Sequence, residues 1–223
     1  NTPSHAILPY SELLDLLPGY LQHSLMETNG KSVDLQGSPV TYATAPVIWG
    51  SAGTKNQHTY FQWLHQGTHL VPSDFIVVAS DTVSAQESVL TFLHFLAQTE
   101  TLLRGTEKSG ASDEQQLPGN KPSTSLLLSD LSPTTLGQLL ALYEHIGFVQ
   151  SVVWNLNPFS HWGIELGKRF SAALGSIDDI AAGHHDSSTL GLLDVFKRMQ
   201  QEQHQRDPFH TGAVREESVY SVF

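Results

Sequence analysis

The sequence contains no cysteine among its 223 residues, which excludes disulfide bonds and thiolate catalysis and fits a cytoplasmic protein. Basic residues are also scarce: 11 Lys and Arg stand against 22 Asp and Glu, and the net charge is -11. Because proteins bind nucleic acids through Lys and Arg that displace phosphate counterions, we expect no nucleic-acid partner. Long apolar runs are missing too, so we expect no helix that spans a membrane.

Hydrophobic residues make up 39% of the chain, enough for the core of one sizeable α/β domain. Leucines at helical spacing predict a first helix over 8–27, which Pro18 and Gly19 should kink or interrupt. The other apolar patterns predict strands at 46–49, 75–80 and 125–128, and helices at 55–66, 83–104, 162–174 and 189–203. Because strands alternate with helices, we predict a three-layer α-β-α sandwich with a parallel sheet, followed by C-terminal helices.

A first polar segment, Met26-Glu27-Thr28-Asn29-Gly30-Lys31, follows the first predicted helix directly. A carboxylate at the C-terminal end of a helix lies where the helix dipole disfavours negative charge. Such a position favours uptake of a proton and suits a general base. The alternative is an exposed glutamate beside an Asn-Gly turn that simply closes the helix.

A second segment, Gly53-Thr54-Lys55-Asn56-Gln57-His58, is a glycine turn that leads into a predicted helix. It offers backbone amides and an imidazole near the mouth of a pocket. His58, His65 and His69 are spaced by seven and four residues, so a zinc site is one alternative. Gly67 is expected to end the helix before His69, which favours structural or surface histidines.

A third segment runs from Phe159 to Lys168 and places Lys168 after two glycines, Gly163 and Gly167. Glycines at this spacing allow another element to pack closely against the helix. They would leave the ammonium group of Lys168 close to the backbone. The simpler interpretation is a lysine on a solvated helix face, where most lysines are found. Taken alone, this segment does not identify an activity.

Several segments, taken in order, resemble the glucose-6-phosphate isomerase family: LPYSELLDLLPGYLQ with METNGK, then GTKNQHTYFQWLHQGT, FLAQTE, LPGNKPS, TLGQLLALYEH with FVQSVVWNLNPF, and WGIELGK. The resemblance covers nearly the whole chain, from about Leu8 to Phe196. Members of this family are considerably longer and have two sugar-isomerase domains, which are flavodoxin-like parallel sandwiches. The resemblance therefore implies a second sugar-isomerase domain over 1–175, a C-terminal helical extension over 176–205 and a polar tail over 206–223.

The resemblance also implies an activity: interconversion of glucose 6-phosphate and fructose 6-phosphate through a cis-enediol, without a metal or an organic cofactor. Glu27 falls on the family's base, His58 on the histidine that assists ring opening across the dimer, and Lys168 on the lysine that handles the ring oxygen. Three further positions fall on the substrate-binding set: Gln22, His23 and His161. A base at the carbon and a separate acid–base pair at the ring oxygen suit this reaction.

Two departures from the family pattern are histidines where glutamines are usual, His23 and His161. The family's Gly-Gly-Arg segment and its Ser/Thr phosphate loop belong to the first domain and are not found here. We therefore expect the chain to be a fragment that is inactive without that domain. The alternatives are a non-catalytic sugar-phosphate sensor, which would need no base, and a metal-dependent isomerase, for which no second ligand cluster is found.

Overall fold

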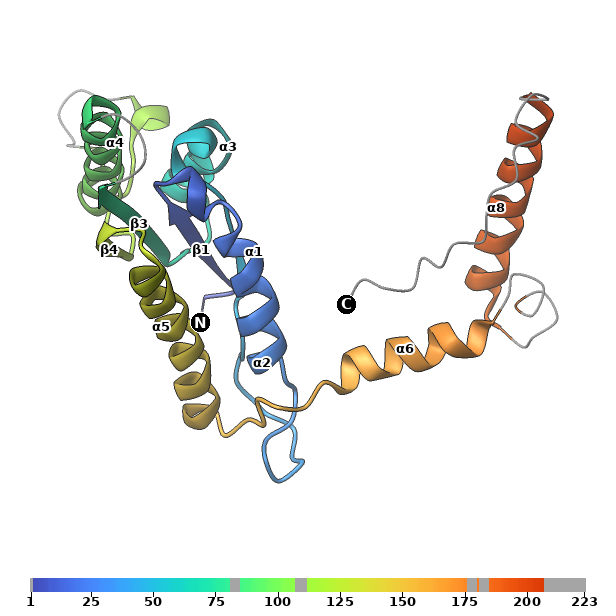
Figure 1. Cartoon of the computed structure of the whole chain (residues 1–223). Coiled ribbons are helices and arrows are strands. Elements are labelled where there is room, and N and C mark those ends of the chain that lie inside the picture. Colours follow the sequence, from blue (N-terminus) through green and yellow to red (C-terminus); the bar gives the residue numbers. More distant parts are fainter. Residues whose placement is uncertain (1, 81–84, 107–111, 176–179, 181–184, 207–223) are drawn as a thin grey trace. The chain divides into compact units, whose positions relative to one another are not determined.

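The computed structural model describes residues 2–80, 85–106, 112–175, 180 and 185–206. The chain divides into two compact units, Asn1–Ser160 and His161–Phe223. The described part of the first unit contains four strands: β1 (Ser4–Pro9), β2 (Val47–Gly50), β3 (Ser73–Ser80) and β4 (Ser123–Asp130). They pair in the order β2-β1-β3-β4, and every pair is parallel (Figure 1). The predicted parallel sheet is confirmed.

Helices connect these strands, as expected for parallel neighbours. In the first unit they are the 3₁₀ turn η1 (Glu12–Leu14), α1 (Leu17–Leu21), the π-helical turn η2 (Gln22–Met26), α2 (Glu27–Asn29), α3 (Gly53–Gln66), α4 (Ala85–Arg104), the 3₁₀ turn η3 (Asp113–Gln115) and α5 (Pro133–Val153). The second unit contains α6 (Trp162–Leu174) and α8 (Ser187–Arg206). The domain boundaries at 175/176 and 205/206 stay a prediction, and the tail beyond residue 206 lies outside the described residues.

The core forms two clusters, one on each face of the sheet, because successive strand residues point to opposite faces. Helices α3 and α4 cover one face, whose buried side chains are Ala6, Leu8, Tyr10, Phe61, Leu64, Val71, Phe75, Val77, Phe95 and Leu102. The segment from η1 to α2 and helix α5 cover the other, whose buried side chains are Ile7, Leu14, Leu17, Leu21, Leu25, Ile48, Ile76, Val78, Leu139 and Tyr143. This is the three-layer α-β-α sandwich that the sequence predicts.

Strand β1 is a correction to the sequence prediction, which placed the start of a helix at Leu8. Ser4–Pro9 is instead a strand in the interior of the sheet, paired with both β2 and β3. Pro9 is the last residue of this strand, where it pairs with Ile76 of β3. The helical segment begins later, and Pro18 lies in the first turn of α1, a position that proline tolerates.

Helix α5 begins with Ser132 as the N-cap and Pro133 in the first turn, residues that suit these two positions. The Ser132 hydroxyl accepts a hydrogen bond from the Thr135 amide at 3.3 Å. Asp130, the last residue of β4, reinforces the cap by accepting from the Ser132 amide at 2.8 Å and from the Thr135 hydroxyl at 3.0 Å. These hydrogen bonds fix the direction in which α5 leaves the sheet.

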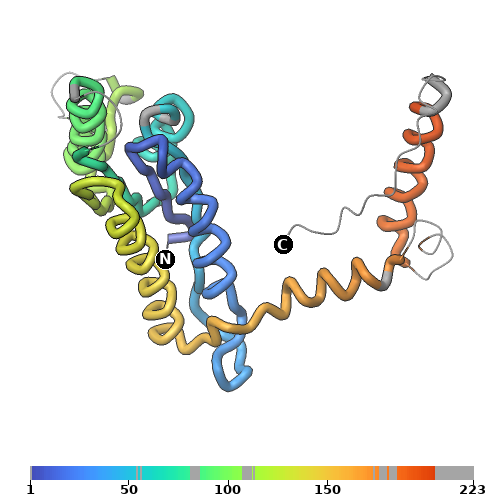
Figure 2. Tube along the Cα trace, viewed as in Figure 1, coloured from blue at the N-terminus to red at the C-terminus, as the bar shows by residue number. Residues whose placement is uncertain are grey.

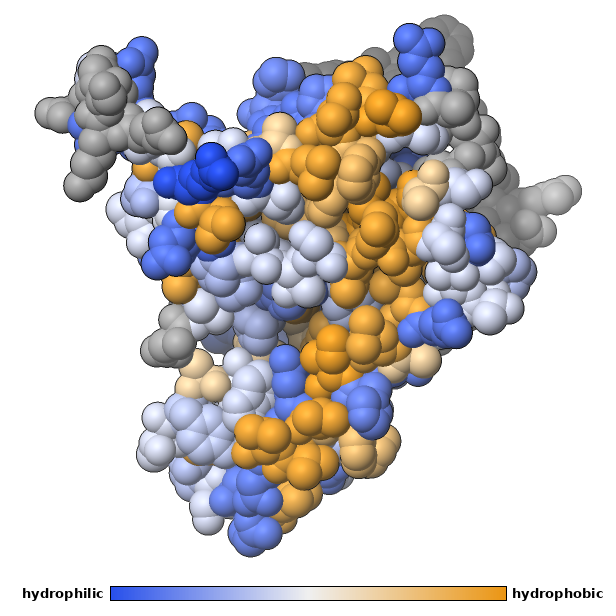
Figure 3. All heavy atoms as spheres, turned by 90° about the vertical axis from the view of Figure 1, so that its left-hand side faces the viewer, coloured by the Kyte–Doolittle hydropathy of each residue, from blue (hydrophilic) through white to orange (hydrophobic). Residues whose placement is uncertain are grey.

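One side of the first unit, formed by α4, β4 and α5, carries a broad apolar surface (Figure 3). The exposed large apolar side chains of these elements include Val89, Leu90, Leu93, Leu96, Leu103, Leu127, Leu142, Phe148, Val149, Val152 and Val153. Strand β4 is an edge of the four-stranded sheet on this side. Within the part of the chain that the structure describes, no helix is long and apolar enough to cross a membrane.

Candidate active site

The helical segment from Glu12 to Asn29 runs antiparallel to β2, side by side with it (Figure 2). Three hydrogen bonds join successive turns of the segment to successive positions along the strand: Ala52 N to Asp15 Oδ1 at 2.8 Å, Gln22 Nε2 to Ile48 O at 3.0 Å, and Ala45 N to Asn29 O at 3.3 Å. The start of the segment therefore lies at the carboxyl end of β2, and its last turn lies at the amino end.

This course separates Glu27 from His58 within one chain. Glu27 lies in the last turn of the segment, at the amino end of β2. His58 lies near the start of α3, which follows the carboxyl end of β2, and Lys55 in the same turn pairs with Glu12 at the start of the segment. The fifteen residues from Glu12 to Glu27, counted at the rise of a helix, span roughly 20 Å, so the two side chains lie at opposite ends of the segment. One copy of the chain does not bring them into one site.

Glu27 has a basic neighbour one turn before it. The imidazole Nε2 of His23 lies 3.3 Å from the carboxylate Oε2 of Glu27. The Glu27 side chain is only 21% exposed, whereas that of His23 is 77% exposed. The π-helical turn Gln22–Met26 leads directly into Glu27, and π-helical turns occur frequently at functional sites. The two residues that the sequence assigns to base and substrate binding are therefore in contact.

The turn that follows Glu27 is held firmly against α5. Asn29 is fully buried, and its amide nitrogen donates to the Gly147 carbonyl and to Gln150 Oε1, both at 3.1 Å. A Cβ at Gly30 would lie 2.5 Å from the Met26 carbonyl oxygen, so only glycine fits this close turn. The Asn-Gly turn does close the helix, but Glu27 beside it is largely shielded rather than exposed.

Lys31 closes the same segment and lies one turn after Glu27. Its ammonium donates to the backbone carbonyl of Glu27 at 2.6 Å and to that of Ser160 at 2.5 Å. Burial lowers the pKa of Lys31, and the negative charge of Glu27 opposes that shift. The Glu27 carboxylate thus contacts His23 one turn before it, and Lys31 one turn after it is bonded to the Glu27 backbone carbonyl.

The second predicted segment begins α3 immediately beyond β2. A Cβ at Gly53 would lie 2.4 Å from the Tyr10 ring, so the glycine allows the helix start to pack on the carboxyl end of the sheet. His58 is exposed one turn later. His65 lies further along the helix, 3.1 Å from Gln98 Oε1. Gly67 ends the helix before His69, as the sequence predicts.

The third segment lies in the second unit. His161 is the N-cap residue of α6, and its carbonyl accepts hydrogen bonds from the Ile164 and Glu165 amides, both at 3.0 Å. Lys168 is exposed on the same helix, seven residues later. His161 itself lies just outside the helical backbone, because its φ and ψ of -130° and 36° are not helical. A site that combines these residues with Glu27 stays a prediction.

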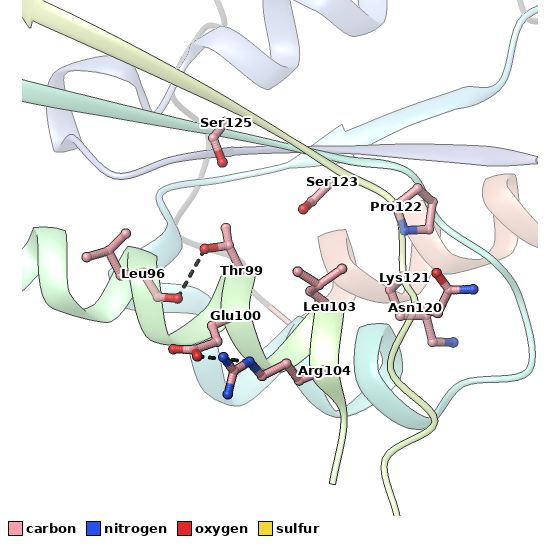
Figure 4. Close-up of a pocket in the computed structure, with 10 residues that line it drawn as sticks. All are labelled: Leu96, Thr99, Glu100, Leu103, Arg104, Asn120, Lys121, Pro122, Ser123 and Ser125. Carbon is pink, nitrogen blue, oxygen red and sulfur yellow. Dashed lines mark hydrogen bonds and ion pairs between the residues drawn. The ribbon is translucent and has the colours of Figure 1, made fainter. Parts of the chain in front are cut away.

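Neither of two large surface clefts contains the proposed catalytic residues. The first cleft, of 700 Å³, lies between α4 and the start of β4 and includes the ion pair of Arg104 with Glu100 (Figure 4). The second, of 640 Å³, is lined by His5, Gln150 and Trp154 among others. No group of three or more His, Asp or Glu side chains among the described residues could hold a metal ion.

Sequence reasoning did not single out a polar group inside the core beside the second cleft. His5 Nε2 of β1 lies 3.1 Å from Asp74 Oδ1 of β3, and the Tyr143 hydroxyl of α5 donates to Asp74 Oδ2 at 3.0 Å. Burial and the neighbouring carboxylate raise the pKa of Tyr143. The one signal in the sequence is an aspartate at the start of an apolar strand, which would not have identified its two partners.

Comparison with known proteins identifies the family. The sequence profile of the phosphoglucose isomerase family matches residues 1–193, most of the chain. The chain belongs to this family. It is 44% identical over 195 residues to glucose-6-phosphate isomerase 1 of Chromohalobacter salexigens, with 87% of this chain and 36% of the relative covered. It is 45% identical over 215 residues to glucose-6-phosphate isomerase of Frankia casuarinae, with 86% and 38% covered.

The fold agrees with this membership of the phosphoglucose isomerase family. The crystal structure of a glucose-6-phosphate isomerase from Chlamydia trachomatis superposes with a TM-score of 0.77 at 34% identity, over 89% of this chain and 38% of that one. The chain thus spans little more than a third of the length of these relatives. The family predicted from the collinear motifs is confirmed, whereas the roles of the individual site residues are not tested by these similarities.

Proposed function

We propose that this chain is the second sugar-isomerase domain of an enzyme that interconverts glucose 6-phosphate and fructose 6-phosphate through a cis-enediol. The observation that carries the proposal is the position of Glu27: a shielded carboxylate, 21% exposed, in a turn that Asn29 holds against α5. A general base must be held in position beside the carbon that it deprotonates, and the fixed turn after Glu27 supports such a role. Relatives named glucose-6-phosphate isomerase support the reaction.

His58 serves a neighbouring copy in this proposal. It assists ring opening, whereas Glu27 moves the proton between the two carbons. Because they lie at opposite ends of the segment from Glu12 to Asn29, the two side chains belong to different sites if each acts. A homodimer of the complete protein, in which each copy lends its His58 to the other, satisfies this geometry.

The remaining roles follow the family pattern. Lys168 handles the ring oxygen, and Gln22, His23 and His161 bind the sugar phosphate. The reaction requires no metal or organic cofactor, because the base and the acid–base pair carry all of the proton transfers. The groups that grip the phosphate belong to the missing first domain, so the isolated chain is inactive or nearly so.

A coupled assay tests this proposal. Fructose 6-phosphate is supplied to the isolated chain and to a chimera in which the chain replaces the matching segment of the Chromohalobacter salexigens relative, and glucose 6-phosphate is followed with its dehydrogenase. We expect turnover by the chimera and little or none by the chain. A folded chimera without activity would contradict the proposal, and full activity of the isolated chain would contradict the need for a first domain.

Glu27→Gln in the chimera separates an enzyme from a sensor. The amide cannot accept the carbon-bound proton, so we expect kcat to fall by about 10²- to 10⁴-fold while sugar-phosphate binding, measured by calorimetry, persists. Glu100→Gln is the matched control, because Glu100 is an exposed glutamate whose partner is Arg104 of α4. Unchanged turnover in Glu27→Gln would assign the domain a binding role instead.

A further inference from the structure

The contact between His23 and Glu27 joins a shielded carboxylate to an exposed imidazole. Nε2 and Oε2 lie 3.3 Å apart, and the exposed fraction rises from 21% at Glu27 to 77% at His23. Histidine can accept a proton at one ring nitrogen while it releases another to water, which glutamine cannot do. The histidine at this position therefore adds a chemical property that the usual glutamine lacks.

The surrounding contacts fix the backbone on both sides of the pair. On one side of His23, the Gln22 amide is bonded to the Ile48 carbonyl of β2. On the other side of Glu27, Asn29 is fully buried and bonded to α5. Between these fixed points the backbone continues as a π-helical turn, and residues four apart lie on one face of the helix.

Other charged groups near the pair lie on the same helical segment and on α5. Lys31 follows Glu27 by one turn and interacts with its charge. Tyr20 precedes His23 by three residues, and its hydroxyl donates to Glu144 of α5 at 2.7 Å. Glu144 already accepts this bond, which raises the pKa of Tyr20. His23 thus both contacts the Glu27 carboxylate and reaches solvent.

We propose that His23 is a positioning and proton-relay residue, which connects the Glu27 carboxyl to water during isomerisation. This inference rests on the proposed function. After Glu27 has taken a proton from substrate carbon, Oε2–H gives it to the unprotonated Nε2 of His23, leaving a carboxylate and an imidazolium. The imidazolium releases a proton to water and becomes neutral. The reverse transfer returns a proton from water to Glu27, so protons and charges balance.

The relay has a measurable signature, because it competes with direct transfer of the same proton to the neighbouring carbon. Fructose 6-phosphate deuterated at C1 is converted in ordinary water, and deuterium retained at C2 of glucose 6-phosphate is measured by mass spectrometry. In the chimera we expect a several-fold higher ratio of retained to exchanged deuterium for His23→Gln than for the unchanged sequence. His94→Gln, an exposed histidine of α4, is the matched control and should leave the ratio unchanged.

A second measurement on the isolated chain does not need activity. The ¹⁵N shifts of the His23 ring nitrogens are recorded before and after Glu27→Gln, and we expect Nε2 to shift, with His94 unaffected. If His23 does not respond, the contact is absent and the relay is overturned, whatever the activity. An active His23→Gln chimera with unchanged deuterium retention overturns the relay and leaves the proposed function intact. Absence of isomerisation in the unchanged chimera overturns the proposed function and the relay with it.

Discussion

The amide nitrogen of Asn29 donates to the backbone carbonyl of Gly147 at 3.1 Å, which joins the turn after Glu27 to the middle of α5. The bond lies between residues that are far apart in the sequence, and Asn29 is fully buried. The position of the proposed base thus depends on the packing of a helix that contributes none of the proposed catalytic residues.

Replacement of Asn29 by alanine should therefore affect both stability and catalysis. Asn29→Ala leaves the Gly147 carbonyl and the Gln150 amide without their donor, and we expect a loss of about 1–3 kcal/mol in the free energy of unfolding. It should also release the Glu27 turn and lower kcat in the chimera. Urea unfolding followed by circular dichroism and the coupled assay measure the two effects.

The matched control for this variant is Tyr143→Phe. It deletes another buried hydrogen bond of α5, from Tyr143 to Asp74, which does not involve Asn29 or the turn after Glu27. We expect a comparable loss of stability, with kcat preserved at temperatures where the variant stays folded. Equal losses of kcat in both variants would show that the Asn29 effect is general destabilisation rather than displacement of the base.

A second prediction concerns acid stability and Asp130. Hydrogen bonds from Ser132 lower the pKa of Asp130 from 3.8 to about 2. A carboxyl with a depressed pKa in the folded state stabilises the fold above its unfolded pKa and loses that contribution as the pH falls through the folded value. Asp130→Asn should therefore weaken the dependence of stability on pH between about 4 and 2. Urea unfolding at several pH values in this window measures it.

The control for Asp130 is Asp194→Asn, a surface aspartate of α8 paired with Arg198. We expect this variant to follow the pH dependence of the unchanged chain. If Asp130→Asn instead gave a stability curve parallel to that of the unchanged chain through the whole window, the cap at the start of α5 would not hold the carboxylate in its charged form.

A third prediction compares two glycines of α5. A Cβ at Gly137 meets no atom within 4 Å, so Gly137→Ala should raise the free energy of unfolding by about 0.5–1 kcal/mol, because alanine loses less backbone entropy in a helix. A Cβ at Gly147 would lie 2.9 Å from Leu25 Cδ2, so Gly147→Ala should raise the free energy of unfolding by less. Urea denaturation of both variants measures the two changes in the free energy of unfolding. A larger gain at Gly147 would contradict the close packing of α5 against the segment before Glu27.

The elements with clear periodicity could be predicted from the sequence, and the strand next to an apolar helix could not. The pattern over 162–174 gave α6 correctly, and the apolar segment at 75–80 lies within β3. The segment at 4–9 was missed because its apolar run lies only a few residues before the leucines of the next helix, and a short apolar run does not distinguish strand from helix. Leu13, included in the predicted apolar stripe, is 59% exposed.

Some features of the candidate site could likewise be predicted from the sequence, and others could not. The three positions proposed to handle protons, Glu27, His58 and Lys168, were identified from motifs, because each lies within a short collinear segment. The four-residue spacing of His23 and Glu27 is visible in the sequence and is typical of a contact on one helix face. The separation of Glu27 from His58 instead depends on the direction in which a helix passes a strand, which is a matter of tertiary packing.

The antiparallel course of the segment beside β2 also has a genetic consequence. If a complete site takes its base from one copy and its histidine from another, two differently damaged alleles can rescue each other. A mixed dimer of Glu27→Gln and His58→Gln subunits would hold one site with both lesions and one site with neither. Two alleles that both alter Glu27, or both alter His58, would never complement, and a cell carrying them would lack isomerase however much of either protein it made.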